Sequence, residues 1–144
     1  MPYTSSQAIA GRGSIIQFGT GSASPYTFSV LAEVKKIQFS GSKYDMADVT
    51  NFESGTFREW LPTLADSGEI SFEANLIPSD ASQAALLTAF NAATLQPWQV
   101  VLPNGVGTFT FNAYVQSLER DVPLDKEATI SGKLKITGQI QFYQ

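Results

Sequence analysis

The chain has 144 residues, enough for one domain with a buried core, and carries 9 basic and 13 acidic residues for a net charge of −4. This balance argues against a protein that grips nucleic acid phosphates, which requires a basic face. Histidine and cysteine are both absent, so the chain has no disulfide or thiolate chemistry and lacks the commonest general base and metal ligand.

The start of the chain lacks a charged region followed by an apolar run, and no apolar run approaches the ~18 residues of a membrane helix. We therefore expect a protein made in the cytoplasm, without a signal peptide and without membrane contact. Small polar residues and glycines over residues 1–13 predict a flexible arm. Short strands are predicted at 14–18, 26–31 and 34–40, with a loop at 19–25.

Residues 41–68 show no sustained hydrophobic period, yet they are rich in aromatic side chains. A structureless loop of this length is uncommon in a compact domain and is usually functional or disordered. Disordered segments are poor in aromatic residues. We therefore expect an irregular segment that becomes ordered against a partner.

Strict alternation of apolar and polar residues over 69–76 predicts a strand with one dry and one wet face. The next element is predicted to be a helix from residue 81 to about 93. Asp80 is its expected N-cap, with Gln83 completing a pair that resembles a capping box. Pro97 lies beyond the expected end of the helix.

Further strands are predicted at 98–102 and 107–118, joined by a Pro-Asn-Gly turn at 103–105. A charged connection at 119–127 is expected to lead to a final strand at 128–142, which is far longer than a usual strand. The sequence thus predicts a single, mainly antiparallel β domain, a sandwich or barrel, with one flanking α-helix.

Without histidine, catalysis would be possible only through carboxylates or lysine. Glu69 and Glu73 share a strand face near Asp66, as in two-carboxylate glycoside hydrolases, but a solvated acidic face is the ordinary explanation. The acidic residues between 45 and 53 lack the spacing of a calcium loop. We expect no enzyme, no metal and no cofactor.

The order of several short segments points to a family. An Asp48-Val49-Thr50 step opens the long acidic and aromatic segment, residues 64–72 (LADSGEISF) lead into a strand, and a helix begins at Asp80. Trp98-Gln99-Val100 then precedes a hairpin with residues 109–115 (FTFNAYV), and the chain ends on residues 128–138 (ATISGKLKITG). Over residues 10–142 this order resembles the major tail tube proteins of long, non-contractile-tailed phages.

That resemblance implies the fold shared by tube proteins of contractile tails and of type VI secretion. Six subunits would join their inner sheets into a ring, and the rings would stack into a hollow tube in the virion tail. The implied partners are other copies of the chain and the tape measure, tail terminator and tail tip proteins. DNA would pass through the lumen without specific binding.

Two groups of residues follow from this resemblance. Ring stacking is expected at the long segment, through Tyr44, Asp45, Asp48, Thr50, Phe52, Glu53, Phe57, Arg58 and Trp60. The lumen is expected to be lined by Glu69, Ser71, Glu73 and Asn75, because an acidic and small polar wall does not attract DNA. Lys133 and Lys135 would pair with these glutamates across the sheet or face outward.

Two other functions stay open at the level of sequence. The chain could be a monomeric β-sandwich that binds carbohydrate by stacking on Trp60 and Tyr44. It could also be another tail protein of the same fold, such as a tail completion or baseplate hub protein. Electron micrographs of concentrated protein separate the first of these from a tube protein, which should form rings or tubes.

Overall fold

The fold is mainly antiparallel β with one flanking helix, as predicted. The computed structural model describes residues 9–20 and 27–144. The elements in chain order are β1 (Ile15–Thr20), β2 (Thr27–Val30), β3 (Val34–Ser40), β4 (Lys43–Asp48), β5 (Trp60–Asp66), β6 (Glu69–Asn75), α1 (Ala81–Ala92), β7 (Gln96–Val101), the short 3₁₀ turn η1 (Pro103–Gly105), β8 (Thr108–Asp121) and β9 (Thr129–Tyr143).

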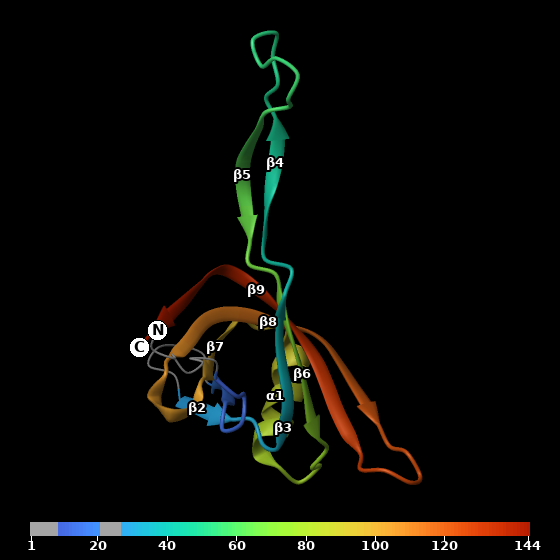
Figure 1. Cartoon of the computed structure of the whole chain (residues 1–144). Helices are drawn as coiled ribbons and strands as arrows, with labels where there is room; N and C mark the ends of the chain where they lie inside the picture. Colours follow the sequence, from blue (N-terminus) through green and yellow to red (C-terminus); the bar gives the residue numbers. More distant parts are fainter. Residues whose placement is uncertain (1–8, 21–26) are drawn as a thin grey trace.

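Seven of these strands form one antiparallel sheet in the order β2-β1-β7-β8-β9-β6-β3. The sheet curls strongly, so that the edge strand β3 approaches β1 near the opposite edge (Figure 1). The two remaining strands, β4 and β5, pair only with each other and rise from the body as a separate hairpin. The result is an open, barrel-like body with one long projection.

The core lies inside the curled sheet and beneath the helix. On β6 the alternation is complete, with Ile70, Phe72 and Ala74 buried between more accessible polar residues. Trp98 of β7 is fully buried, and its ring stacks on Phe18 of β1 at a centroid distance of 4.8 Å. Such a pair contributes about 0.5–1.5 kcal/mol beyond the area that it buries.

The glycine at position 132 explains how two neighbouring strands press against β9. A Cβ atom at Gly132 would lie 2.9 Å from the Phe72 ring and 2.9 Å from the Leu118 side chain. The close approach suggested by a glycine on the dry face of a strand is therefore real. Any larger residue here would push apart the side chains of β6 and β8.

The helix begins as predicted, with Asp80 accepting a hydrogen bond from the Gln83 backbone N–H at 3.2 Å. The predicted capping box is wrong in one respect. The Gln83 side chain accepts from the Ile77 N–H at 2.9 Å and donates to the Asn75 carbonyl at 2.8 Å. It thereby ties the start of α1 to the end of β6. Leu86 is fully buried, and α1 packs on β8.

Several boundaries differ from the sequence prediction. The charged connection begins later than expected, because β8 continues to Asp121 and pairs there with Thr129 of β9. Charged side chains on this solvated ribbon do not prevent backbone pairing. Residues 1–8 of the predicted arm and 21–25 of the predicted loop lie outside the described residues, while Gly19 and Thr20 belong to β1.

Candidate functional site

The segment 41–68 is a β-hairpin rather than the irregular loop that we predicted. Strands β4 and β5 pair from Lys43 opposite Asp66 to Asp48 opposite Trp60, with a register shift after Tyr44. Neighbouring positions such as Trp60 and Leu61 lie on opposite faces, and both are about half exposed. The shift and the apolar residues on both faces remove the alternation by which a strand is recognised in sequence.

The tip of the hairpin, residues 49–59, is held by short polar contacts. The Thr50 N–H donates to Asp48 at 2.9 Å, and the Glu59 N–H donates to the Thr50 hydroxyl at 2.9 Å. The Glu53 N–H donates to the Asn51 side chain at 2.9 Å. The Thr50 side chain, and after it the Thr50 backbone N–H, lowers the pKa of the Asp48 carboxyl. Thr50 and Asp48 thus shape the loop that carries the outermost aromatic residues.

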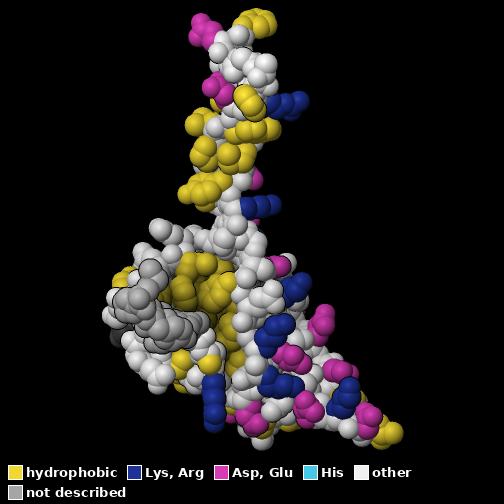
Figure 2. Space-filling model, in the orientation of Figure 1, with side chains coloured by type: hydrophobic (Ala, Val, Ile, Leu, Met, Phe, Trp, Pro, Cys, Tyr) yellow, Lys and Arg dark blue, Asp and Glu magenta, His cyan; other side chains and the backbone are white. Residues whose placement is uncertain are grey.

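The long hairpin, residues 43–66, exposes an apolar surface that no other part of the described chain covers. Phe52 at its tip is fully exposed and Phe57 is 81% exposed. The exposed large hydrophobic residues of the hairpin are Tyr44, Met46, Val49, Phe52, Phe57, Trp60, Leu61 and Leu64. Figure 2 shows their yellow side chains stacked along the projection. An exposed apolar patch of this kind marks a contact surface for another protein.

Polar contacts fix the hairpin where it leaves the body. The Asp66 carboxylate accepts from the Gly68 N–H at 2.8 Å and forms an ion pair with Lys135 of β9 at 3.2 Å. These two contacts lower the pKa of Asp66, the backbone contact having the larger effect. The Ser42 hydroxyl donates to the Ser67 carbonyl at 2.8 Å, and the Ser67 hydroxyl donates to the Gly138 carbonyl. The hairpin therefore stands at a defined angle to the sheet.

This anchoring network is what sequence reasoning missed. Lys135 was expected to pair with a lumen-facing glutamate or to face outward. It lies opposite Glu69 in the β6–β9 register but forms its ion pair with Asp66 instead. Only Gly68, which follows Asp66 and Ser67, indicated a sharp turn in the sequence.

The four predicted lumen residues do share one face of the sheet. Glu69, Ser71, Glu73 and Asn75 are partly exposed and alternate with the buried residues of β6. Across the neighbouring strands, Glu73 lies opposite Lys36 of β3, and Ser71 lies opposite Lys133 of β9. The face is therefore mixed in charge rather than simply acidic.

The same polar face continues onto β8, where Glu119 and Asp121 lie opposite Ser131 and Thr129. Over the four strands β3, β6, β9 and β8 it carries four carboxylates and three ammonium groups. Its members are Lys36, Glu69, Glu73, Glu119, Asp121, Lys133 and Lys135. We call this surface the polar face; its fixed charge is close to zero.

Catalytic and metal-binding arrangements find no support in the residues described. Residues 9–20 and 27–144 contain no group of three or more side chains placed to hold a metal ion. The carboxylates of Glu69 and Glu73 lie within a sheet face interleaved with lysines. In the same part of the chain no helix is long and apolar enough to cross a membrane.

Comparison with solved structures shows where this fold is found. The tail of an empty gene transfer agent particle, refined with C6 symmetry, has a chain with a TM-score of 0.76 and 20% identity, covering 95% of this chain and 100% of that one. The SPP1 tail tube protein has a TM-score of 0.73 and 16% identity, and the match covers 94% of this chain and 79% of that one. A chain in the sheath–tube complex of an extracellular contractile injection system (PVC) has a TM-score of 0.68 and 14% identity, and the match covers 94% of this chain and 91% of that one.

None of the curated proteins compared with the chain matches it significantly. A family model described as phage tail tube protein matches residues 8–142, which cover all the strands and the helix described above except the last residue of β9. This match gives no support to a carbohydrate-binding module or to an enzyme. The chain belongs to the phage tail tube protein family, and it is a structural protein of the virion tail.

Proposed function

We propose that copies of this chain join into rings of six that stack into the hollow tube of a long, non-contractile tail, through which DNA passes during ejection. One observation supports this proposal beyond the family match: the long hairpin presents eight large apolar side chains that residues 9–20 and 27–144 leave exposed. The gene transfer agent tail with the same fold has C6 symmetry, which supports the ring number. The likeness to the SPP1 tail tube supports the type of tail.

Two open strand edges support a closed ring. Strand β3 ends the sheet, and β8 pairs with β7 only as far as Ala113 although it continues beside β9 to Asp121. Residues 114–121 of β8 therefore have a free edge toward the side of β7. Because β3, β6, β9 and β8 alternate in direction, joining β3 to this edge of the next copy continues the antiparallel order. Such a head-to-tail contact closes into a ring when its rotation allows.

The long hairpin is the proposed stacking element between rings. A two-stranded ribbon is marginally stable alone, and buried aromatic residues dominate the energy of protein interfaces. Phe52, Phe57 and Trp60 are the apolar anchors in this proposal, and Tyr44 extends the surface toward the body. Asp45, Asp48, Glu53 and Arg58 would form the polar rim, with Thr50 shaping the tip.

The polar face is the proposed wall of the lumen, with Glu69, Ser71, Glu73 and Asn75 in its centre. A wall of near-zero fixed charge holds DNA weakly, since phosphate attraction grows with the number of cations along the path. DNA would thus slide without specific binding. At the two ends the tube would meet the tape measure, terminator and tip proteins.

Electron microscopy of purified protein over a concentration series tests this proposal. The full chain should form hollow tubes built from six-fold rings, and a variant with residues 44–65 replaced by a short Gly-Ser turn should form rings at most. A chain that stays monomeric at every concentration, or tubes that survive loss of the hairpin, would contradict it. A single terminal ring without growth would instead indicate a tail completion or hub protein.

A further inference from the structure

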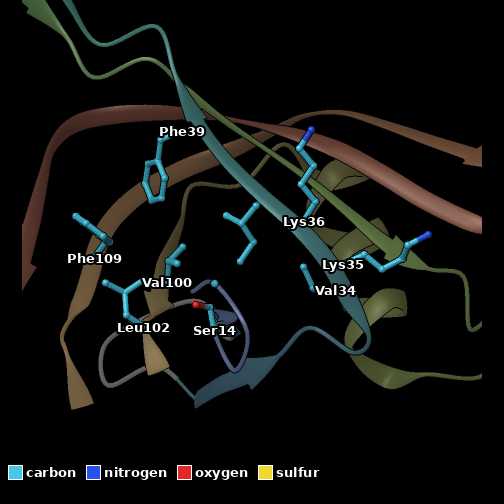
Figure 3. A pocket seen from close by; sticks show the side chains of 10 residues that line it. Ser14, Val34, Lys35, Lys36, Phe39, Val100, Leu102 and Phe109 are labelled. Atoms are coloured by element: carbon cyan, nitrogen blue, oxygen red, sulfur yellow. The ribbon is translucent and has the colours of Figure 1, made fainter. Parts of the chain in front are cut away.

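The curled sheet leaves an apolar groove between β3 and the strands β7 and β8. The groove has a volume of about 460 Å³. Figure 3 shows Phe39 and Val34 of β3 facing Val100, Leu102 and Phe109 across it. Phe39 is 37% exposed, and its ring lies 5.2 Å from that of Phe109. Among residues 9–20 and 27–144, the body therefore carries an open apolar groove as well as an apolar projection.

The groove and the polar face lie on opposite sides of β3. Ile37 and Phe39 point into the groove side, whereas the intervening Lys36 and Gln38 pair with Glu73 and Ser71 of the polar face. An occupant of the groove therefore does not compete with DNA in the proposed lumen. It also leaves the polar residues of β3 free to line that lumen.

We propose that this groove receives the aromatic tip of the long hairpin from another copy of the chain, with Phe52 and Phe57 as the inserted side chains. A volume of 460 Å³ lies within the range of about 300–1,000 Å³ that holds compact ligands. It accommodates one or two aromatic rings rather than the whole ribbon. Both of these rings are almost fully exposed on the free chain.

The chain's own hairpin cannot fill the groove. The hairpin points away from the body (Figure 1), and the contacts of Asp66 with Gly68 and Lys135 hold its base in that direction. A hairpin tip in the groove must then come from a second copy. Because the contact uses two different surfaces, a stack of copies has a free hairpin at one end and a free groove at the other. Further copies can therefore add at both ends along a tube.

Charge supports the same occupant. The hairpin has five acidic residues and two basic residues between positions 43 and 66. Lys35 borders the groove, and Arg12 lies between the lining residues Gly11 and Ser14, whereas Lys36 lines both the groove and the polar face. Lys35 is already paired with Glu127 at 2.8 Å, which raises its pKa, while Lys36 forms no ion pair within the described residues. The tip, residues 49–59, has two acidic residues and one basic residue, so its small negative charge faces a rim that carries Arg12.

The contact is part of the stacking proposed above and rests on that proposal. Cross-linking tests it directly, because the chain has no cysteine of its own. Thr56→Cys on the hairpin tip and Ser14→Cys on the groove are combined and treated with a short bifunctional maleimide in concentrated protein. A ladder of cross-linked chains is expected, since each copy has one donor and one acceptor. The matched control combines Thr56→Cys with Asn91→Cys on the exposed side of α1 and should give no ladder.

Adding Phe52→Ala and Phe57→Ala to the first pair should lower the cross-linking yield about tenfold or more, as expected when anchoring aromatic residues are lost. The inference is wrong if the ladder is absent, if the control pair gives it equally, or if the alanine changes leave it unaltered. It is also wrong if Ser14→Cys links instead to Tyr3→Cys, which would place the N-terminal segment in the groove. Tubes that form in micrographs without this cross-link would overturn the contact and leave the proposed function standing.

Discussion

At the scale of single residues, Gly68 decides how the long hairpin leaves the sheet. Its φ is +88°, and a Cβ atom there would lie 2.1 Å from the Ser40 carbonyl oxygen and 2.7 Å from the Gly41 carbonyl carbon. Both the left-handed conformation and the close backbone approach require glycine. The Gly68 N–H also donates to Asp66, so the same residue carries part of the anchoring network.

Gly68→Ala should therefore destabilise the protein by several kcal/mol, more than the ~1–2 kcal/mol of the left-handed conformation alone. Urea denaturation of the monomer measures this change in the free energy of unfolding. Gly55→Ala is the matched control, because Gly55 also has a positive φ, +76°, but nothing lies within 4 Å of an added Cβ. Equal losses for the two variants would show that the close backbone approach has no energetic effect.

At the scale of elements, the sequence predicted the strands and the helix whose signals are local, within a few residues of one another along the chain. The alternation of β6 and the length of β9 follow from one dry side and one wet side, and the Asp80 cap of α1 follows from a local hydrogen bond to the Gln83 N–H. The long hairpin could not be predicted in the same way. Its apolar residues, such as Trp60 and Leu61, serve contacts outside the chain, and its strands therefore carry no dry face. The Asp66–Lys135 pair also joins residues far apart in sequence, which no local pattern reveals.

The hairpin should accordingly be mobile in the monomer and ordered in the tube. Its strands pair only with each other, and most of its side chains are exposed, so little holds the ribbon closed. Hydrogen exchange over residues 43–66 should be fast in the monomer and slow in the tube, while β6 stays protected in both. Trp60→Ala should leave the body folded yet weaken stacking. Slow exchange of the hairpin in a proven monomer would contradict this expectation.

At the scale of the whole molecule, charge is unevenly distributed over the fold. No charged residue occurs in residues 13–32 or 81–118, which hold β1, β2, α1, β7 and most of β8. The charges gather on the polar face, on the β8–β9 ribbon and on the long hairpin, and Figure 2 shows this separation. The gap in charge is visible in the sequence. The order of the strands is not, because pairings such as β6 with β9 join distant segments without a local signal.

This separation allows a direct test of the proposed lumen. Glu69→Lys combined with Glu73→Lys would leave two carboxylates among seven charged groups of the polar face, and ring symmetry would repeat that change around every ring. Tubes should still form, but DNA ejection should slow or stall because a basic wall attracts phosphates. Added salt should relieve the defect by screening this attraction.

The matched control places the same two charges on the opposite side of the fold, with Thr88→Lys and Asn91→Lys on the exposed side of α1. These changes add the same two ammonium groups, although they raise the net charge by two where the lumen variant raises it by four, and they should leave ejection at the wild-type rate. Micrographs must first show that both variants form tubes of normal length. If the lumen variant then ejects DNA as fast as the control, wall charge does not govern passage, and the polar face loses its assigned role.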